Sequence, residues 1–294
     1  MTEGTAVVLG GAGAVGELFV RLLGAHVPTT VVDRTSSPIA PTVIGDVCDP
    51  SPEVLDAVRT ADTVVIALPE DVALHALSAC AHAFRAGCLV VDTLSVKHAV
   101  AVTLARIAAE RGVEALSLNP MFAPALGFRG HAVAAVPVVP GPRAAWLLEL
   151  ITAVGARPVE LTAEEHDLVT AVAQAATHAA VLALGRVAAE LGGGIDRLGE
   201  LAPPPHRALL ALLARITGAN PDVYWDVQAG NPAAAKARAA LAAALTDLDS
   251  LVAADDREGF SRLLGDLGTW LGPRGDDLRA QAIRQLEALR PSTG

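Results

Sequence analysis

Short runs of aliphatic and β-branched residues alternate with longer helix-like segments through the first 160 residues of the chain. The predicted strands are Thr5–Leu9, Thr29–Asp33, Asp62–Leu68, Cys88–Asp92, Glu114–Leu118, Ala132–Val139 and Arg157–Glu160. The predicted helices are Gly13–Gly24, Ser51–Thr60, Asp71–Arg85, Val96–Arg111 and Ala144–Val154. Strands that alternate with helices build a parallel sheet with helices on both faces. We therefore expect an α/β fold in this half.

The pattern changes after Leu161, from where we predict helices and no further strand. Thr162 and Glu165 form a capping-box sequence, in which each side chain accepts from the other residue's backbone N–H. A long helix should follow and reach about Leu191, where three consecutive glycines stop it. The second half, residues 161–294, is therefore expected to be all-helical.

Composition narrows the classes of protein to which the chain can belong. Of its 294 residues, 52% are hydrophobic and 18% charged, so it can bury a sizeable core and is not disordered. The net charge is −10, and no basic cluster that could bind nucleic acid is present. We expect a small-molecule partner and no nucleic acid.

Hydropathy and cysteine usage bear on location. Leu168–Gly185 carries no charged residue, but its polar side chains favour a buried helix over a membrane span. The first five residues lack a basic region, so no signal peptide is expected. Cys48, Cys80 and Cys88 show no metal-ligand spacing and are typical of reduced core residues. These features predict a cytoplasmic protein without a metal site or a membrane partner.

A glycine-rich turn between the first strand and helix predicts a dinucleotide site. Gly11, Gly13 and Gly16 fit G-x-G-x-x-G, in which the glycines make the tight turn, admit the pyrophosphate and let the helix pack on the strand. Asp33 ends the next strand, where it can bind the ribose hydroxyls and repel a 2′-phosphate. NAD is therefore favoured over NADP, although Arg34 could stack on adenine or pair with a phosphate. We also expect contacts to the cofactor from Val15, Leu68 and Pro69.

We accordingly divide the chain into a Rossmann-type dinucleotide-binding domain, residues 1–160, and an all-α domain, residues 161–294.

Further motifs are Val91–Lys97 (VDTLSVK), Leu118–Pro124 (LNPMFAP), Glu164–Asp167 (EEHD), Gln174–His178 (QAATH) and, after two arginines, Asn220–Tyr224 (NPDVY). In this order they resemble the prephenate dehydrogenase family, over about residues 5–230. The resemblance implies NAD(P)-dependent oxidative decarboxylation of a cyclohexadiene, and a helical domain that forms a homodimer and closes the active-site cleft.

The chain departs from the family pattern at Asn119, where the family has a histidine. In the family, that imidazole accepts the proton of the substrate's 4-hydroxyl while hydride leaves C4. An asparagine amide cannot take up a proton near pH 7, and loss of a positioned base lowers the rate by about 10²- to 10⁴-fold. A neutral amine at C4 needs no such base, because its lone pair expels the hydride. The favoured substrate is therefore 4-amino-4-deoxyprephenate, giving 4-aminophenylpyruvate, with prephenate as the alternative.

The resemblance assigns further site residues, each with a structural alternative. Ser95 would bind the C4 substituent, or it caps the helix that begins near Val96. Lys97 would bind substrate, or it is an exposed first-turn lysine. Arg215 would bind the ring carboxylate with support from Arg207, the alternative for each being an internal salt bridge. The apolar run around Arg215 suggests burial, where a carboxylate ligand would offset the cost of its charge.

Polar residues recur every four positions on the long predicted helix: His166, Thr170, Gln174 and His178. We expect these polar side chains to line a water-filled cavity. His178 and Gln174 would bind the substrate carboxylate or pyruvyl group. His166 could instead support the start of the helix.

Two other interpretations remain open. A β-hydroxyacid-type dehydrogenase would share the two-domain plan, but the only lysine after residue 161, Lys236, lies in an alanine-rich setting unlike a catalytic site. A non-catalytic dinucleotide sensor would explain Asn119 as lost catalysis.

Overall fold

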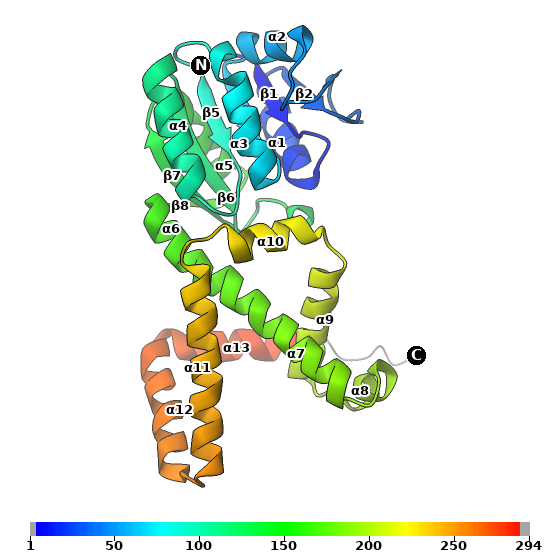
Figure 1. The fold of residues 1–294 in the computed structure, drawn as a ribbon, viewed down its shortest axis with the longest axis vertical. Helices are drawn as coiled ribbons and strands as arrows, with labels where there is room; N and C mark the ends of the chain where they lie inside the picture. Colours follow the sequence, from blue (N-terminus) through cyan, green and yellow to red (C-terminus); the bar gives the residue numbers. More distant parts are fainter. Residues whose placement is uncertain (1–3, 289–294) are drawn as a thin grey trace. The chain divides into compact units, whose positions relative to one another are not determined.

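The computed structural model describes residues 4–288 and divides into two compact units (Figure 1). The first runs to Thr170 and also contains Trp225–Pro232. The second contains Ala171–Tyr224 and the chain from Ala233 onward. The division therefore falls ten residues later than the predicted boundary after residue 160, and a short later segment returns to the first unit.

The first unit is built on an eight-stranded sheet in the order β3-β2-β1-β4-β5-β6-β7-β8. Its strands are β1 (Ala6–Leu9), β2 (Thr29–Asp33), β3 (Thr42–Ile44), β4 (Thr63–Ile66), β5 (Leu89–Asp92), β6 (Glu114–Pro120), β7 (Ala132–Val139) and β8 (Arg157–Glu160). Every neighbouring pair is parallel except β6 and β7. The strand order from β3 to β6 is that of a dinucleotide-binding fold. The predicted α/β class is confirmed; only β3, three residues long, was missed.

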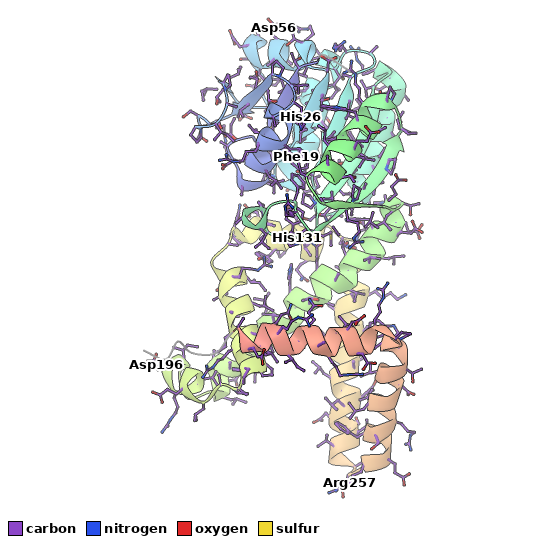
Figure 2. The ribbon with its side chains drawn as sticks, turned by 180° about the vertical axis from the view of Figure 1, so that it is seen from behind. Phe19, His26, Asp56, His131, Asp196 and Arg257 are labelled. Carbon is purple, nitrogen blue, oxygen red and sulfur yellow. The ribbon has the colours of Figure 1, made fainter. Side chains whose placement is uncertain are left out.

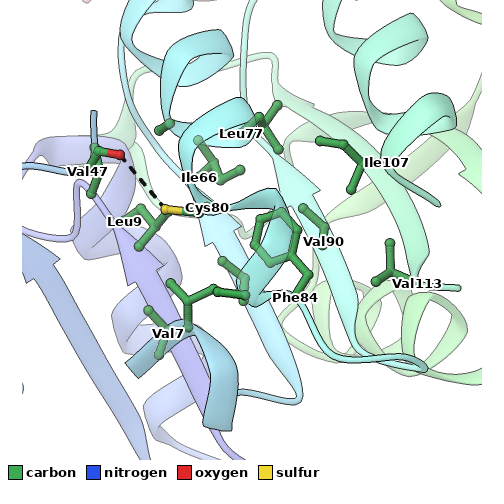
Figure 3. Packing of buried hydrophobic residues seen from close by; sticks show 14 of the residues in the cluster. Val7, Leu9, Val47, Ile66, Leu77, Cys80, Phe84, Val90, Ile107 and Val113 are labelled. Carbon is green, nitrogen blue, oxygen red and sulfur yellow. Dashed lines mark hydrogen bonds between the residues drawn. The ribbon is translucent and has the colours of Figure 1, made fainter. Parts of the chain in front are cut away.

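Two apolar clusters pack on opposite faces of this sheet. One joins Val7 and Leu9 of β1 to helices α2 (Pro52–Thr60), α3 (Glu70–Cys80) and α4 (His98–Arg111) (Figure 3). The other joins Ala6 and Val8 of the same strand to α1 (Ala14–Gly24) and α5 (Pro142–Ala153). Alternate residues of β1 point to opposite faces, so the sheet is covered on both sides, as predicted.

Aromatic residues reinforce the second cluster. Phe19 of α1, labelled in Figure 2, is fully buried. Its ring meets that of Phe128 edge to face, with the centroids 5.7 Å apart. Phe122 makes a similar contact with Phe128 and stacks on His131. These contacts hold the loop that follows β6 against the sheet. The candidate site residue Asn119 lies near the end of β6, just before this loop.

The cysteines are only partly as expected. Cys80 and Cys88 are buried and unpaired, and burial raises the pKa of each thiol to about 11. The Cys80 thiol donates to the Val47 carbonyl oxygen at 3.8 Å (Figure 3). Cys48 is exposed, so its assignment to the core was wrong.

The described part of the second unit contains helices and connecting turns but no strand, as expected. Its helices are α7 (Thr177–Leu191), α8 (Ile195–Leu201), α9 (Pro204–Thr217), α11 (Ala234–Ala253), α12 (Arg257–Leu271) and α13 (Arg274–Glu287), with α10 (Pro221–Ala229) divided between the two units. Within this unit α7 packs on α9, and α11 packs on α12.

The long helix predicted after Leu161 has three parts: α6 (Ala163–Thr170), a π-helical segment (Ala171–Ala176) and α7. The predicted capping box is confirmed at its start, where the Thr162 N–H donates to Glu165 and the Glu165 N–H donates to the Thr162 hydroxyl. By length and composition Ala163–Leu191 could cross a membrane. Only 22% of its most apolar window is buried, so the expectation of a buried helix was wrong for the single chain.

Candidate active site

The glycine-rich turn begins one residue earlier than the predicted motif. Gly10 adopts a φ of +81°, and a Cβ there would overlap the Ala67 carbonyl oxygen. It is therefore Gly10, and not Gly11 as expected, whose backbone conformation makes the tight turn. Gly11 is required for another reason, because a Cβ there would lie 2.7 Å from the Val31 side chain. At Gly16 a Cβ would overlap the Gly10 carbonyl oxygen, so the predicted close packing of helix on strand is confirmed.

The start of α1 is left open toward solvent. Gly13 is its N-cap, is exposed and supplies no side-chain cap. A Cβ at Gly13 would approach no neighbour closer than 3.4 Å, so the space beside it is free. The first N–H groups of a helix lack partners within it, and the positive end of the helix dipole lies there. The pyrophosphate of a dinucleotide fits this arrangement, with half-buried Val15 at its edge.

The second part of the cofactor region is the end of β2. The Asp33 carboxylate accepts from the Ala12 N–H and the Thr35 N–H, each at 3.1 Å, so it is held beside the glycine-rich turn. Arg34 is exposed next to it. Leu68 is half-buried and Pro69 is exposed, both between β4 and α3. The residues predicted for dinucleotide binding thus follow the carboxyl ends of three adjacent strands, β2, β1 and β4.

Ser95 and Asn119 lie at the same sheet edge, after β5 and near the end of β6. Ser95 is half-buried, and its hydroxyl makes no hydrogen bond within residues 4–288. Helix α4 begins at His98 with Lys97 as its N-cap, so the capping alternative for Ser95 was wrong. The hydroxyl remains available for a ligand, and its substrate role stays a prediction.

Lys97 is fully buried, so the alternative of an exposed first-turn lysine was wrong. Its ammonium donates to Asp92 at 2.8 Å and to the Leu118 carbonyl oxygen at 2.7 Å. Burial lowers the pKa of Lys97, while the charge of Asp92 opposes that shift. These bonds join the end of β5 to the residue before Asn119. The contacts of Lys97 indicate that it positions this edge, and direct substrate binding stays a prediction.

Asn119 is part of a buried polar chain of three residues. Its side-chain Nδ2 lies 3.0 Å from Nε2 of His166, and Nδ1 of His166 lies 2.8 Å from Asp167. Asn119 is 2% exposed and His166 fully buried. The Asp167 carboxylate also accepts from the backbone N–H groups of Lys97 and His98, each at 2.9 Å. His166 therefore contacts the predicted catalytic position directly and does more than support the start of its helix.

Glu70, at the start of α3, carries a strongly shifted carboxyl group. Burial raises the pKa of Glu70 to about 7, and the negative charges of Asp226, Asp71 and Asp167 add to the effect, while Lys97 opposes it. The Glu70 backbone N–H donates to Asp226 at 3.3 Å. A carboxyl group that titrates near neutrality follows β4 directly, at the edge where the cofactor residues lie.

The shift of Glu70 predicts a pH-dependent stability. Between about pH 4.5 and 7 the folded chain holds a proton on Glu70 that the unfolded chain has lost, so this group makes the free energy of unfolding fall as pH rises. We expect Glu70→Gln to remove the contribution of this group to the decrease in unfolding free energy with rising pH. Urea unfolding measured at about pH 5 and about pH 8 tests this. Exposed Glu164→Gln is the control and should leave the pH dependence unchanged. Equal pH dependence in Glu70→Gln and the native chain would contradict the prediction.

Gln174 and His178 belong to the second unit, where the intervening π-helical segment changes the helical register of the predicted stripe. Gln174 Oε1 and His178 Nδ1 are both buried and lack a hydrogen-bond partner among the described residues. The His178 ring meets the Tyr224 ring with the centroids 4.8 Å apart. Burial lowers the pKa of His178, and Arg215 adds to the effect. Unpartnered buried polar atoms indicate a ligand or water site.

His166 and Thr170 of the same stripe are bonded inside the first unit. The Thr170 hydroxyl donates to the His166 carbonyl oxygen at 2.9 Å and accepts from the Asn231 amide at 3.1 Å. The four residues of the stripe are therefore divided between the two units.

Arg215 is exposed, so the argument that burial forces it to find a carboxylate was wrong. It makes no ion pair within the described chain, which also excludes the internal salt bridge there. Arg207 is half-buried and donates to the Ala202 carbonyl oxygen at 3.0 Å. Arg215 thus offers a free guanidinium on α9, close enough to His178 to influence its pKa.

Three functional candidates escaped the sequence analysis: Gly10, Glu70 and Asp167. The adjacent pair of glycines was a usable signal for Gly10, since either one could carry the positive φ. Asp167 was visible only as part of the EEHD motif, and its bonds to the start of α4 join residues about 70 positions apart. No local pattern predicts the shift of Glu70, which arises from burial and from distant acidic residues.

Comparisons with known proteins agree with this geometry. Residues 18–136 match the nucleotide-binding domain of prephenate dehydrogenase, and residues 162–266 match its dimerization domain. A 4-amino-4-deoxyprephenate dehydrogenase of Streptomyces pristinaespiralis is 46% identical over 290 residues, 97% of either chain. A probable arogenate/prephenate dehydrogenase of Methanocaldococcus jannaschii is 25% identical over 278 residues, which cover 92% of this chain and 62% of that relative.

A solved structure shares the fold. It is that of prephenate dehydrogenase from A. aeolicus in complex with hydroxyphenyl propionate and NAD+, with a TM-score of 0.74 and 17% identity. The match covers 92% of this chain and 97% of that chain.

Proposed function

Because this chain belongs to the prephenate dehydrogenase family, we propose that it converts 4-amino-4-deoxyprephenate into 4-aminophenylpyruvate with NAD as oxidant. Membership of that family excludes a β-hydroxyacid-type dehydrogenase. The observation that carries the choice of substrate is Asn119, at the position where the family has its histidine base. The 46% identity to a relative that bears this substrate in its name supports the same choice.

The reaction needs no protein base at C4. The nicotinamide supplies the hydride acceptor when NAD is bound. As the hydride leaves C4 with its electron pair, the amine lone pair forms a carbon–nitrogen double bond. The bond from C1 to the carboxylate then breaks, and its electron pair aromatises the ring as CO₂ departs. Both protons stay on nitrogen, so an asparagine that accepts a hydrogen bond from the amine is sufficient.

The chain supplies the binding groups for this substrate. Ser95 and Asn119 bind the C4 substituent at the edge formed by β5 and β6, and Lys97 holds the backbone of that edge through Leu118. Arg215 binds the ring carboxylate with Arg207 in support, because a guanidinium can pair with a carboxylate in bidentate fashion. His178, whose pKa is lowered by burial and by Arg215, and Gln174 hydrogen-bond the pyruvyl group through buried atoms that lack another partner among the described residues.

The test compares prephenate and 4-amino-4-deoxyprephenate as substrates while NADH formation is followed. We expect kcat/KM to be about 10²- to 10⁴-fold higher for the amine, the usual contribution of a general base. Faster turnover of prephenate would overturn the proposed substrate. Inactivity on both compounds by a chain that still binds NAD would instead identify a sensor.

The preference for NAD depends on the Asp33 carboxylate, which would repel a 2′-phosphate. We expect Asp33→Ser to shift the ratio of kcat/KM for NAD over NADP toward NADP by about 10- to 100-fold. Arg34→Ala is the matched control, and it should weaken the use of NADP more than the use of NAD. A ratio unchanged by Asp33→Ser would show that other groups select the cofactor.

A homodimer through the helical unit accompanies this function. Apolar side chains of α12, among them Leu264 and Leu267, are more than half exposed in the single chain. Large exposed apolar surfaces on a helical unit are typical of subunit interfaces. We expect sedimentation to give the mass of a dimer, which Leu264→Asp should shift toward monomer while Ser261→Asp, on the same helix, does not. A monomeric native chain would contradict the assembly.

A further inference from the structure

The polar chain that reaches Asn119 starts at the first turn of α4. This helix has no side-chain cap of its own, and Asp167 of α6 takes that place by accepting from the N–H groups of Lys97 and His98. The carboxylate of Asp167 can only accept, so Nδ1 of His166, 2.8 Å away, must be the donor of their hydrogen bond. The bonds of Asp167 to the start of α4 therefore determine which nitrogen of His166 is the donor.

The same logic passes from His166 to Asn119. Nδ2 of the Asn119 amide can only donate and lies 3.0 Å from Nε2 of His166, so Nε2 is the acceptor and the imidazole carries its single proton on Nδ1. The amide oxygen Oδ1 therefore points away from His166. Oδ1 makes no hydrogen bond within residues 4–288, and it is not among the buried polar atoms that lack a partner, so it retains contact with solvent.

A second set of contacts holds this chain of bonds in place. The Asn231 amide donates to the Asp167 carbonyl oxygen at 2.8 Å and to the Thr170 hydroxyl at 3.1 Å. His166, Asp167 and Asn231 are each at most 4% exposed. Water cannot readily replace these partners, so the directions of the bonds persist.

We propose that His166 and Asp167 are positioning residues that lock the Asn119 amide with its oxygen outward, as a permanent acceptor for a ligand N–H group. This inference rests on the proposed function and deepens it, since it makes the orientation of Asn119 a determinant of substrate choice. A freely rotating amide would present its NH₂ group as often as its oxygen, and NH₂ cannot accept from an amine. The locked oxygen favours a substrate that keeps N–H donors throughout hydride transfer.

Two variants of His166 separate positioning from general support. Leucine fills much of the same space but cannot accept from Asn119, whereas glutamine has one acceptor and one donor, as the neutral imidazole does. We expect His166→Leu to lower kcat on the amine about tenfold, the value of one hydrogen bond, with the Kd for NAD unchanged. His166→Gln should stay within about threefold of the native chain. Ser117→Ala, a buried change on the same strand as Asn119, is the control and should leave kcat unaltered.

A spectroscopic measurement tests the orientation without turnover. In ¹⁵N NMR of histidine-labelled protein, His166 should appear as the Nδ1–H tautomer, identified among the eight histidines by its loss in His166→Gln. An Nε2–H form or an imidazolium would reverse the Asn119 amide and overturn the inference. Equal losses of kcat in the leucine and glutamine variants, or no loss in either, would also overturn it. Failure of the native chain to oxidise the amine would refute the proposed function, while the NMR result would still decide the orientation.

Discussion

Replacing Asn119 with histidine is expected to raise kcat on prephenate by about 10²- to 10⁴-fold, the contribution of a positioned general base. The substitution restores the imidazole that the family has at this position. Nε2 of His166, which accepts from Asn119, would accept an N–H from the new ring and leave its other nitrogen free to take the substrate proton. The measurement is the initial rate of NADH formation with prephenate at saturating NAD.

The controls for this gain are chosen at the same position and its partner. Asn119→Gln changes the side chain without adding a base and should give no gain on prephenate. Adding His166→Leu to Asn119→His should remove part of the gain, because the new imidazole then loses the acceptor that orients it. If Asn119→His leaves prephenate turnover unchanged, other residues decide between the two substrates.

Replacing Lys97 with methionine is expected to lower the free energy of unfolding by about 3–5 kcal/mol, because a buried carboxylate then loses its partner. Asp92 is fully buried, and one of its oxygens already lacks a hydrogen-bond partner in the described structure. The Leu118 carbonyl oxygen would lose its bond to the ammonium as well. Urea unfolding followed by circular dichroism measures the change.

A double variant and a surface variant serve as controls for the loss of stability in Lys97→Met. Lys97→Met combined with Asp92→Asn removes the unpaired charge and should recover part of the lost stability. Arg106→Met breaks an exposed pair with Glu110 on the same helix and should cost less than about 0.5 kcal/mol. A loss in Lys97→Met as small as that in Arg106→Met would show that the buried pair contributes little.

Local patterns were sufficient for most of the secondary structure and for the position of the cofactor loop. Strands such as Thr29–Asp33 and Ala132–Val139 were predicted with their observed bounds. A run of apolar β-branched residues between turns is a local pattern that indicates a strand without knowledge of its neighbours. The capping box at Thr162 was predictable for the same reason, since its two partners lie three residues apart. Motif spacing likewise predicted the family and the departure at Asn119.

Burial and long-range partners could not be predicted in this way. An exposed position was the alternative to substrate binding for Lys97, and burial was expected for Arg215. Both were wrong, because exposure depends on which elements pack over a residue. The π-helical segment divided a stripe that a regular α-helix would have kept on one face.

Residue identities and short spacings along the chain were thus enough to establish the dinucleotide fold, the family and an asparagine where a base is expected. Folding added the direction in which that asparagine faces. Its orientation depends on His166 and Asp167, 47 and 48 positions further along the chain, and on the start of α4. Hydrogen bonds across such separations form only once the sheet and helices have packed. Only in the packed structure does the donor or acceptor role of one buried group determine the role of the next group bonded to it.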